Sequence, residues 1–131
     1  MRPTKREYYL GIAEAVARRS TCIRRQYGAV IVKDDAIVST GYNGAARGEP
    51  NCCDIGSCWR DEHNIPHGER YEMCRAVHAE QNAINNADRA ALIGSTLYLV
   101  GLENGQRIDA KPCLMCERSI KNARIAEVIT R

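Results

Sequence analysis

Two short motifs, separated by more than thirty residues, constrain the fold of this chain most strongly. The first is His78-Ala79-Glu80, and the second is Pro112 followed by Cys113 and Cys116 in a C-x-x-C arrangement. Imidazole nitrogen and thiolate sulfur are preferred zinc donors, and three protein ligands with one open position are typical of a catalytic zinc ion. Because each motif is expected at the beginning of a helix, the fold must bring two helix N-termini to one point.

Glu80 gives this site its chemistry. It follows the histidine by two residues and can move protons beside the metal without being a ligand. The partial positive charge of helix N-termini favours the two thiolates and holds Glu80 near the metal. The alternative is a structural zinc whose fourth ligand is one of the five other cysteines. That alternative leaves Glu80 and Pro112 unexplained, so we predict a catalytic site.

Composition narrows the class of protein. Seven cysteines occur in 131 residues, and the basic N-terminus leads into no apolar signal region. In such a chain metal binding explains cysteines better than disulfides do. No apolar run reaches the length of a membrane span. We therefore expect one domain over residues 1–131, in the cytoplasm and without a membrane partner. The net charge of +3 does not by itself indicate nucleic-acid binding and is compatible with a phosphorylated substrate.

The hydrophobic pattern predicts alternating helices and strands. Helical spacing covers residues 5–19, with Thr4 as N-cap, and also residues 73–91 and 113–122. Strands are expected over 28–33, 36–42, 96–100 and 125–129, the first two joined as a hairpin. This order predicts an α/β fold of three layers, α-β-α, in which helices cover both faces of a mixed sheet. A sheet of four strands leaves an edge that oligomerisation can cover.

Beyond the metal motifs, three segments resemble the deoxycytidylate (dCMP) deaminase family. They are residues 39–44 (STGYNG), 51–54 (NCCD) and 74–84 (CRAVHAEQNAI), and the resemblance runs from about residue 5 to the C-terminus. The zinc motif alone is typical of all zinc nucleobase deaminases. The resemblance implies a cytidine-deaminase-like fold and hydrolytic deamination of dCMP to dUMP for thymidylate synthesis. It also implies a homo-oligomer, with a hexamer favoured.

The resemblance assigns roles to individual residues. Water activated by the zinc attacks C4 of cytosine, while Glu80 protonates N3 and then the departing amine. The Ala79 backbone reads the base edge, and Asn43 hydrogen-bonds the sugar. Arg89, expected about three turns after His78 on the same helix, contacts the phosphate, from a neighbouring subunit if necessary. The alternatives are an asparagine that only forms a turn and an arginine that only lies on the surface.

Some family members carry a second, structural zinc that orders a cysteine-rich insertion, which here spans residues 44–74. The corresponding ligands in this chain are Cys22, Cys52, Cys74 and His67, with Cys53 or Cys58 as substitutes. A closed set of four ligands can order a long loop that has no core of its own. The alternative is that these thiols pack as small hydrophobic groups.

The resemblance also raises the question of regulation. Many family members are activated by dCTP and inhibited by dTTP, through a loop after GYNG that usually has a proline between glycines. Here residues 44–48 read GAARG, with alanine in the expected place. Glycines let a phosphate approach the backbone, and Arg47 can assist. The two nucleotides therefore remain effectors to test.

Four rival functions remain open. A tRNA adenosine deaminase has a similar C-x-x-C motif, but needs a basic surface for the RNA backbone and usually lacks the insertion and the GYNG asparagine. Deamination of dCTP instead of dCMP is the second rival, because one arginine cannot distinguish the number of phosphates. Free cytidine deaminases rank lower, since they generally have cysteine in place of His78. A non-catalytic, zinc-stabilised module is the fourth rival.

Overall fold

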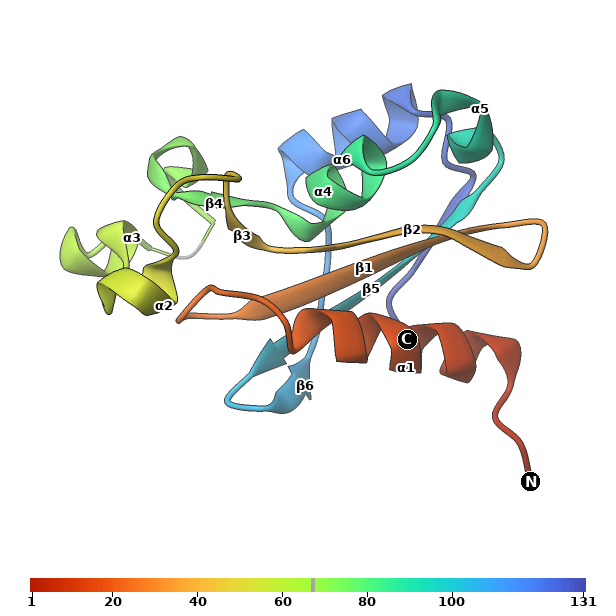
Figure 1. Cartoon of the computed structure of the whole chain (residues 1–131), viewed down its shortest axis with the longest axis horizontal. Helices are drawn as coiled ribbons and strands as arrows, with labels where there is room; N and C mark the ends of the chain where they lie inside the picture. Colours follow the sequence, from red (N-terminus) through yellow and green to blue (C-terminus); the bar gives the residue numbers. More distant parts are fainter. Residues whose placement is uncertain (67) are drawn as a thin grey trace.

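The computed structural model describes residues 1–66 and 68–131, which form three layers (Figure 1). The middle layer is a mixed sheet of β1 (Gln26–Lys33), β2 (Ala36–Tyr42), β5 (Thr96–Glu103), β6 (Gln106–Ile108) and β7 (Glu127–Ile129). Helix α1 (Lys5–Ala17) covers one face, and α4 (Ala79–Asn85), α5 (Arg89–Leu92) and α6 (Leu114–Asn122) lie on the other. The predicted α/β architecture is confirmed. Within the described residues, no helix is long and apolar enough to cross a membrane.

Strand pairing follows the predicted hairpin and extends it. β1 pairs antiparallel with β2, and Asp34 and Asp35 in the turn have φ of 51° and 61°. Two consecutive positive φ values are characteristic of the two-residue turn that matches strand twist. The other edge of β1 pairs antiparallel with β5. The far edge of β5 is shared, because β7 pairs parallel with residues 96–98 and β6 pairs antiparallel with residues 101–103.

Strand β6 corrects the predicted sheet of four strands. It returns from β5 through Asn104 and Gly105, which have φ of 52° and 78°. An Asn-Gly pair is a strong hairpin signal, so the sequence contained a cue for this strand that the prediction missed. β6 pairs with the part of β5 that β7 leaves free, which shortens the exposed edge.

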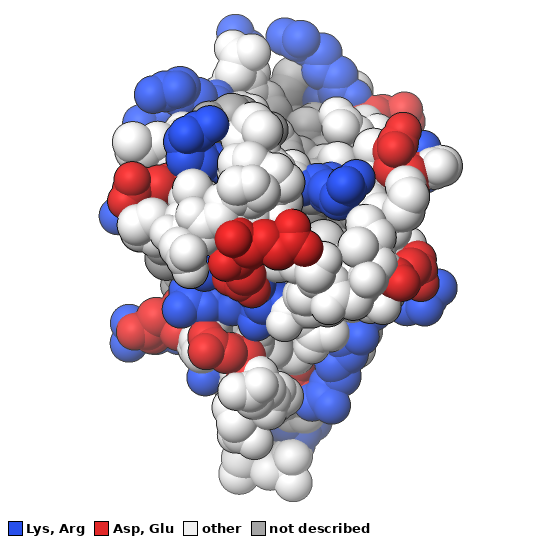
Figure 2. Space-filling view, turned by 90° about the vertical axis from the view of Figure 1, so that its left-hand side faces the viewer, with Lys and Arg blue, Asp and Glu red and all other residues white. Residues whose placement is uncertain are grey.

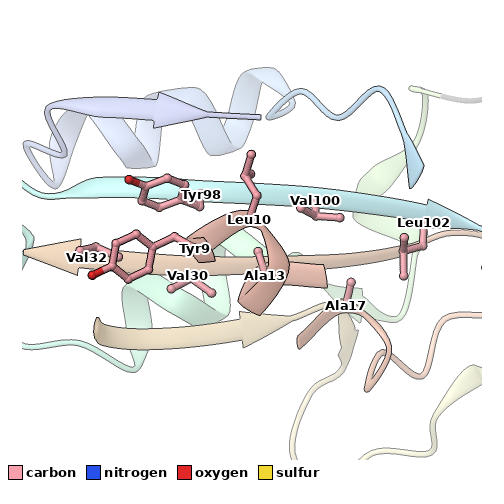
Figure 3. Close-up of a cluster of buried hydrophobic side chains, with 9 residues drawn as sticks. All are labelled: Tyr9, Leu10, Ala13, Ala17, Val30, Val32, Tyr98, Val100 and Leu102. Atoms are coloured by element: carbon pink, nitrogen blue, oxygen red, sulfur yellow. The ribbon is translucent and has the colours of Figure 1, made fainter. Parts of the chain in front are cut away.

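Helix α1 packs on the sheet through one apolar stripe. Thr4 caps it as predicted: its Oγ1 accepts a hydrogen bond from Glu7 N at 3.1 Å, and its own N donates to Glu7 Oε1 at 3.0 Å. This reciprocal pair satisfies two backbone donors at the helix start. Figure 3 shows the buried cluster that results, which consists of Tyr9, Leu10, Ala13, Ala17, Val30, Val32, Tyr98, Val100 and Leu102.

Helix α4 lies unusually close to β2, and this contact positions the chemistry. Ser39 Oγ donates to Ala83 O at 2.7 Å across the interface. A Cβ atom on Gly41 would lie 2.3 Å from Ala83 N and 2.5 Å from Ala79 O. Only a glycine allows so close an approach of two backbones. The N-terminal end of α4, with His78, is thereby fixed against β2.

We expect Gly41→Ala to destabilise the fold by about 1–3 kcal/mol, because the added methyl group meets backbone atoms that cannot move independently. Thermal unfolding measures the effect. Gly11→Ala is the control: Gly11 lies exposed in α1 with no atom within 4 Å of the added Cβ, and alanine should stabilise this helix by about 0.5–1 kcal/mol. A neutral Gly41→Ala variant would contradict the close packing of α4 on β2.

The predicted helix over residues 73–91 is wrong in its extent. Residues Tyr71–Met73 form a short 3-10 helix, and β4 (Ala76–Val77) pairs antiparallel with β3 (Gly44–Ala45) before α4 begins. α4 ends at Asn85, and Asp88 is the N-cap of the separate α5. Tertiary strand pairing overrides the helical spacing at one end, while asparagine and aspartate, which favour turns and caps, interrupt it at the other.

The segment predicted to lack periodicity contains two short helices. These are α2 (Cys52–Ile55) and α3 (Trp59–Glu62), which lie at the left of Figure 1, beyond the end of the sheet.

The bounds of two predicted helices differ slightly from the prediction. α1 ends at Ala17, two residues before the predicted boundary, and α6 begins at Leu114 with Cys113 as its N-cap.

Candidate active site

The structure brings the three predicted zinc ligands together. His78 is the N-cap of α4, Cys113 is the N-cap of α6, and Cys116 lies in the first turn of α6. The Sγ atoms of Cys113 and Cys116 lie 3.6 Å and 3.3 Å from His78 Nδ1. All three donor atoms lie within 4.8 Å of one another, and no other such His, Cys, Asp or Glu group occurs among the described residues.

These distances fit a zinc ion. With Zn–S and Zn–N bonds of about 2.3 Å and 2.0–2.1 Å, tetrahedral geometry separates nitrogen from sulfur by about 3.6 Å. Burial lowers the pKa of His78, which favours the neutral imidazole that a metal requires. Burial raises the pKa of Cys116, so its thiolate needs a neighbouring cation. The donor set and its surroundings therefore suit Zn²⁺.

Two contacts fix the orientation of His78. Its backbone N donates to Gln81 Oε1 at 2.9 Å. The Tyr71 ring meets the imidazole edge-on, with 5.2 Å between centroids and an interplanar angle of 82°. The Arg60 guanidinium lies over the Tyr71 ring, 4.7 Å from its centroid. Arg60 and Tyr71 belong to the insertion, and sequence reasoning identified neither, because their contacts depend on the tertiary fold.

Glu80 occupies the place that proton transfer requires. It lies in the first turn of α4, two residues beyond the ligand His78, and is 5% exposed. Burial raises the pKa of the Glu80 carboxyl, and a hydrogen bond with Cys116 opposes this shift. A carboxyl with a raised pKa can both accept and donate a proton near neutral pH.

A cavity of about 110 Å³ opens beside these residues. Its lining includes His78, Glu80 and Cys113, and also Ala79 and Asn43, both predicted to contact substrate. The structure thus places two predicted substrate residues at the same cavity as the metal set and Glu80.

Asn43 makes structural contacts that the sequence did not predict. Its Oδ1 accepts hydrogen bonds from Ser20 Oγ at 2.6 Å and Tyr27 N at 2.8 Å, and its Nδ2 donates to Arg25 O at 2.9 Å. An amide group has two N–H donors, so a second hydrogen of Nδ2 is available to a ligand in the cavity. The interpretation as a simple turn residue does not account for these contacts.

Arg89 does not lie where its spacing predicted. Arg89 does not share a helix with His78, contrary to the prediction, since α4 ends at Asn85 and Arg89 begins α5. Its side chain is exposed, and Arg89 is not among the described residues lining the cavity. Instead, the lining contains four basic residues that the sequence analysis did not assign to the site: Arg24, Arg25, Arg60 and Lys111.

Four cysteines outside the first metal set face the same cavity: Cys22, Cys52, Cys58 and Cys74. Burial raises the pKa of Cys52 to about 11, and the other three thiols contribute to the shift. The four lie near one another without reaching the close spacing of the first set. Cys53 is exposed, and the predicted ligand His67 lies outside the described residues. All seven cysteines are free thiols.

A second cavity, of about 510 Å³, lies beside the loop after β3. Arg47 lines it and donates from Nη2 to Asn86 Oδ1 at 3.3 Å. Arg19 and Asn51 also line this cavity. The loop considered above for effector binding therefore borders a polar hollow that is separate from the metal set.

Comparisons with known proteins agree with this geometry. Residues 3–131 match the family described as the cytidine and deoxycytidylate deaminase zinc-binding region. The deoxycytidylate deaminase of Mycobacterium phage D29 is 41% identical over 133 residues, covering 98% of this chain and 94% of the relative. That of Schizosaccharomyces pombe is 34% identical over 128 residues, but these cover only 37% of the yeast protein.

A solved structure gives the same fold. The dCMP deaminase of cyanophage S-TIM5, crystallised with dCMP and dUMP, superposes with a TM-score of 0.67 and 29% identity. The match covers 98% of this chain and 81% of that chain.

Proposed function

Because the chain belongs to the cytidine and deoxycytidylate deaminase zinc-binding family, we propose that it is a zinc-dependent enzyme that deaminates dCMP hydrolytically to dUMP and ammonia. The observation that carries this proposal is the buried Glu80 beside a set of three zinc donors at one cavity. A relative of nearly the same length is named for this activity, and the similar cyanophage enzyme was solved with its substrate and product.

The residues of this chain divide the reaction between them. His78, Cys113 and Cys116 would hold the zinc ion, which when bound would supply a water whose pKa lies near neutrality. Glu80 would take a proton from the attacking water, whose oxygen bonds to C4 of cytosine, and would deliver that proton to N3. Glu80 then passes the second proton of the water to the amino group, which leaves as ammonia while C4 becomes the carbonyl of uracil.

The proposed substrate contacts follow from the cavity lining. The Ala79 backbone, between the ligand His78 and Glu80, is available to the base edge, and the remaining Nδ2 hydrogen of Asn43 is available to the sugar. A phosphate contact from Arg89, which is exposed on its own subunit, requires a neighbouring copy of the chain in a homo-oligomer. We keep a hexamer as the proposed assembly, which sedimentation analysis tests.

A second, structural zinc is proposed for the thiols of Cys22, Cys52, Cys58 and Cys74. Four cysteines form a closed tetrahedral set, and their segments come together only through the insertion. Cys58, a substitute in the initial ligand set, thus takes the place first assigned to His67.

We expect two zinc ions per chain in the wild-type protein and about one in Cys58→Ser, because loss of one ligand opens the closed site. Elemental analysis of purified protein measures this content. Cys53→Ser is the matched control, since Cys53 is exposed and does not line the cavity, and it should keep two. One zinc in the wild type, unchanged in Cys58→Ser, would contradict the second site.

The second cavity is the proposed place for dCTP or dTTP as effectors, with Arg47 as a phosphate contact. Binding of each effector, measured by calorimetry with wild type and Arg47→Gln, tests the regulatory proposal.

The proposed role in nucleotide metabolism and the free thiols accord with a cytoplasmic location.

A substrate panel tests the proposed function. The absorbance of cytosine is followed with dCMP, deoxycytidine and dCTP, and inosine formation with a tRNA anticodon stem-loop. We expect turnover of dCMP, with little on deoxycytidine. Figure 2 shows acidic and basic side chains interspersed on the face at the insertion end, rather than a continuous basic surface for RNA. Inosine formation without dCMP turnover would identify the protein as an RNA-editing deaminase. Turnover of dCTP alone would show that its substrate is dCTP and not dCMP.

A further inference from the structure

The two ring nitrogens of His78 have different surroundings. Nδ1 faces the Sγ atoms of Cys113 and Cys116, so it is the nitrogen that fits the zinc ion. In most metal sites the other ring nitrogen donates to a carboxylate or carbonyl oxygen, and this hydrogen bond fixes the ring plane. Within the described part of the chain, no such acceptor meets Nε2. The orientation of the imidazole therefore depends on the side chains packed against it.

Tyr71 is an aromatic side chain packed against this imidazole. The two rings lie nearly at right angles, at 82°, with 5.2 Å between their centroids. Edge-to-face pairs at this separation are attractive beyond the area that they bury. Both residues line the cavity beside the metal set. Rotation of the imidazole away from the two thiols would lose this geometry, so the contact favours the ring orientation that binds metal.

Arg60 holds Tyr71 in place from within the insertion. Its guanidinium carbon lies 4.7 Å from the centroid of the Tyr71 ring, and the residue is 5% exposed. A cation over an aromatic face is attracted more strongly when both are removed from water. Nε donates to Glu69 O at 3.1 Å, and Nη2 donates to Pro66 O at 2.8 Å. These two carbonyl groups fix the guanidinium plane, so Tyr71 lies against a rigid partner.

We propose that Tyr71 is a positioning residue for the metal ligand His78, and that Arg60 acts on His78 through Tyr71. This inference rests on the proposed function and deepens it. The insertion contributes neither a ligand of the catalytic zinc nor the proton carrier Glu80. Through these two side chains it nevertheless sets the affinity and the geometry of the catalytic metal site.

Two changes of Tyr71 test the role of its ring. Tyr71→Leu removes the ring and should weaken binding of the catalytic zinc about 10- to 100-fold, the range typical for an outer partner of a metal-binding histidine. Tyr71→Phe keeps the ring and should keep the wild-type affinity. Competition with a chromogenic chelator measures zinc release, and the release step that Cys116→Ser lacks belongs to the catalytic ion. Equal losses in Tyr71→Leu and Tyr71→Phe would overturn the inference.

Trp59→Leu is the matched control. Trp59 is also an aromatic residue of the insertion that packs on an imidazole, with 4.1 Å between the ring centroids of Trp59 and His63. His63 does not belong to the metal set, and Trp59 is not among the described residues lining the cavity. Trp59→Leu should therefore keep the wild-type affinity for the catalytic zinc. A loss equal to that of Tyr71→Leu would show that any damage to the insertion weakens the site.

A double-mutant cycle tests the route from Arg60. Arg60→Met keeps a long side chain but removes the charge and the N–H donors, and should weaken binding of the catalytic zinc. In the Tyr71→Leu background the same change should cause no further loss, because Arg60 has no ring left to hold. Additive losses from the two changes would show that Arg60 acts on the metal site independently of Tyr71.

Cobalt substitution reports the geometry of the site. The visible absorption bands of Co²⁺ depend on the arrangement of its ligands, and they should differ from those of the wild type in Tyr71→Leu but not in Tyr71→Phe. If Tyr71 were only a wall of the substrate cavity, Tyr71→Leu would raise KM for dCMP and leave both the spectrum and the zinc affinity unchanged. That result would contradict a positioning role.

The metal-binding measurements separate this inference from the proposed reaction, because they require no turnover. A wild-type protein that leaves dCMP unchanged, but whose zinc affinity falls in Tyr71→Leu and not in Tyr71→Phe, would refute the reaction alone. A protein that deaminates dCMP, but binds the catalytic zinc equally well with and without the Tyr71 ring, would refute the inference alone.

Discussion

Replacing Glu80 with glutamine is expected to lower kcat for dCMP by about 10²- to 10⁴-fold, the range typical for loss of a general acid–base group. Glutamine keeps the shape and hydrogen-bonding capacity of the side chain but cannot carry a proton between water, N3 and the leaving amine. The effect should fall on kcat rather than KM, because proton transfer occurs after the substrate is bound.

The Glu80→Gln protein should remain folded and keep its zinc, because Glu80 is not among the three donors. Elemental analysis and thermal unfolding check both properties beside the kinetic assay. Glu117→Gln is a matched control: Glu117 follows Cys116 on α6 but does not line the cavity, so its kcat should be that of the wild type. A Glu80→Gln enzyme with wild-type kcat would rule out Glu80 as the proton carrier.

Cys116→Ser is expected to abolish turnover by removing zinc from the catalytic site. Cys116 is fully buried, with 0% exposure, and its Sγ lies 3.3 Å from His78 Nδ1. A serine hydroxyl is a poor substitute for thiolate, and two remaining ligands cannot retain the ion at the affinity of three. The zinc content should fall by about one ion per chain, and the Tm should fall as well, because metal binding contributes to folding.

Metal removal from the wild type tests the same point without a mutation. A chelator should inactivate the enzyme, and Zn²⁺ should restore activity to the wild type but not to Cys116→Ser. Cys53→Ser, which changes an exposed thiol, should retain both zinc and activity. Full activity of a protein shown to be free of zinc would contradict the assignment of His78, Cys113 and Cys116.

The metal site and much of the sheet could be predicted because their signals are local. His78, Glu80 and the two cysteines occur in short motifs whose spacing is set by the first turn of a helix. The Asp34-Asp35 turn and the flanking apolar runs likewise define a hairpin within one stretch of sequence. In each case the physical cause of the structure lies within a few residues, so periodicity and motif spacing were sufficient to predict it.

The parts that the sequence did not reveal depend on contacts between distant segments. Helical spacing continued through residues 76–77, but pairing with β3 makes this segment a strand. Separately, the turn after Asn85 ends α4 before Arg89, which therefore does not share a helix with His78 as predicted. Arg24 could not be distinguished from the other arginines near it in the sequence, because its salt bridge is to Asp61, a distant residue within the insertion.

The stoichiometry of the reaction with zinc-loaded wild-type protein tests the proposed deamination of dCMP directly. Consumed dCMP, dUMP and ammonia are quantified together in one time course, with Glu80→Gln in parallel. We expect one dUMP and one ammonia for each dCMP, and almost no product with the variant. A folded, zinc-loaded wild-type protein that leaves dCMP unchanged would show that this chain is not a dCMP deaminase.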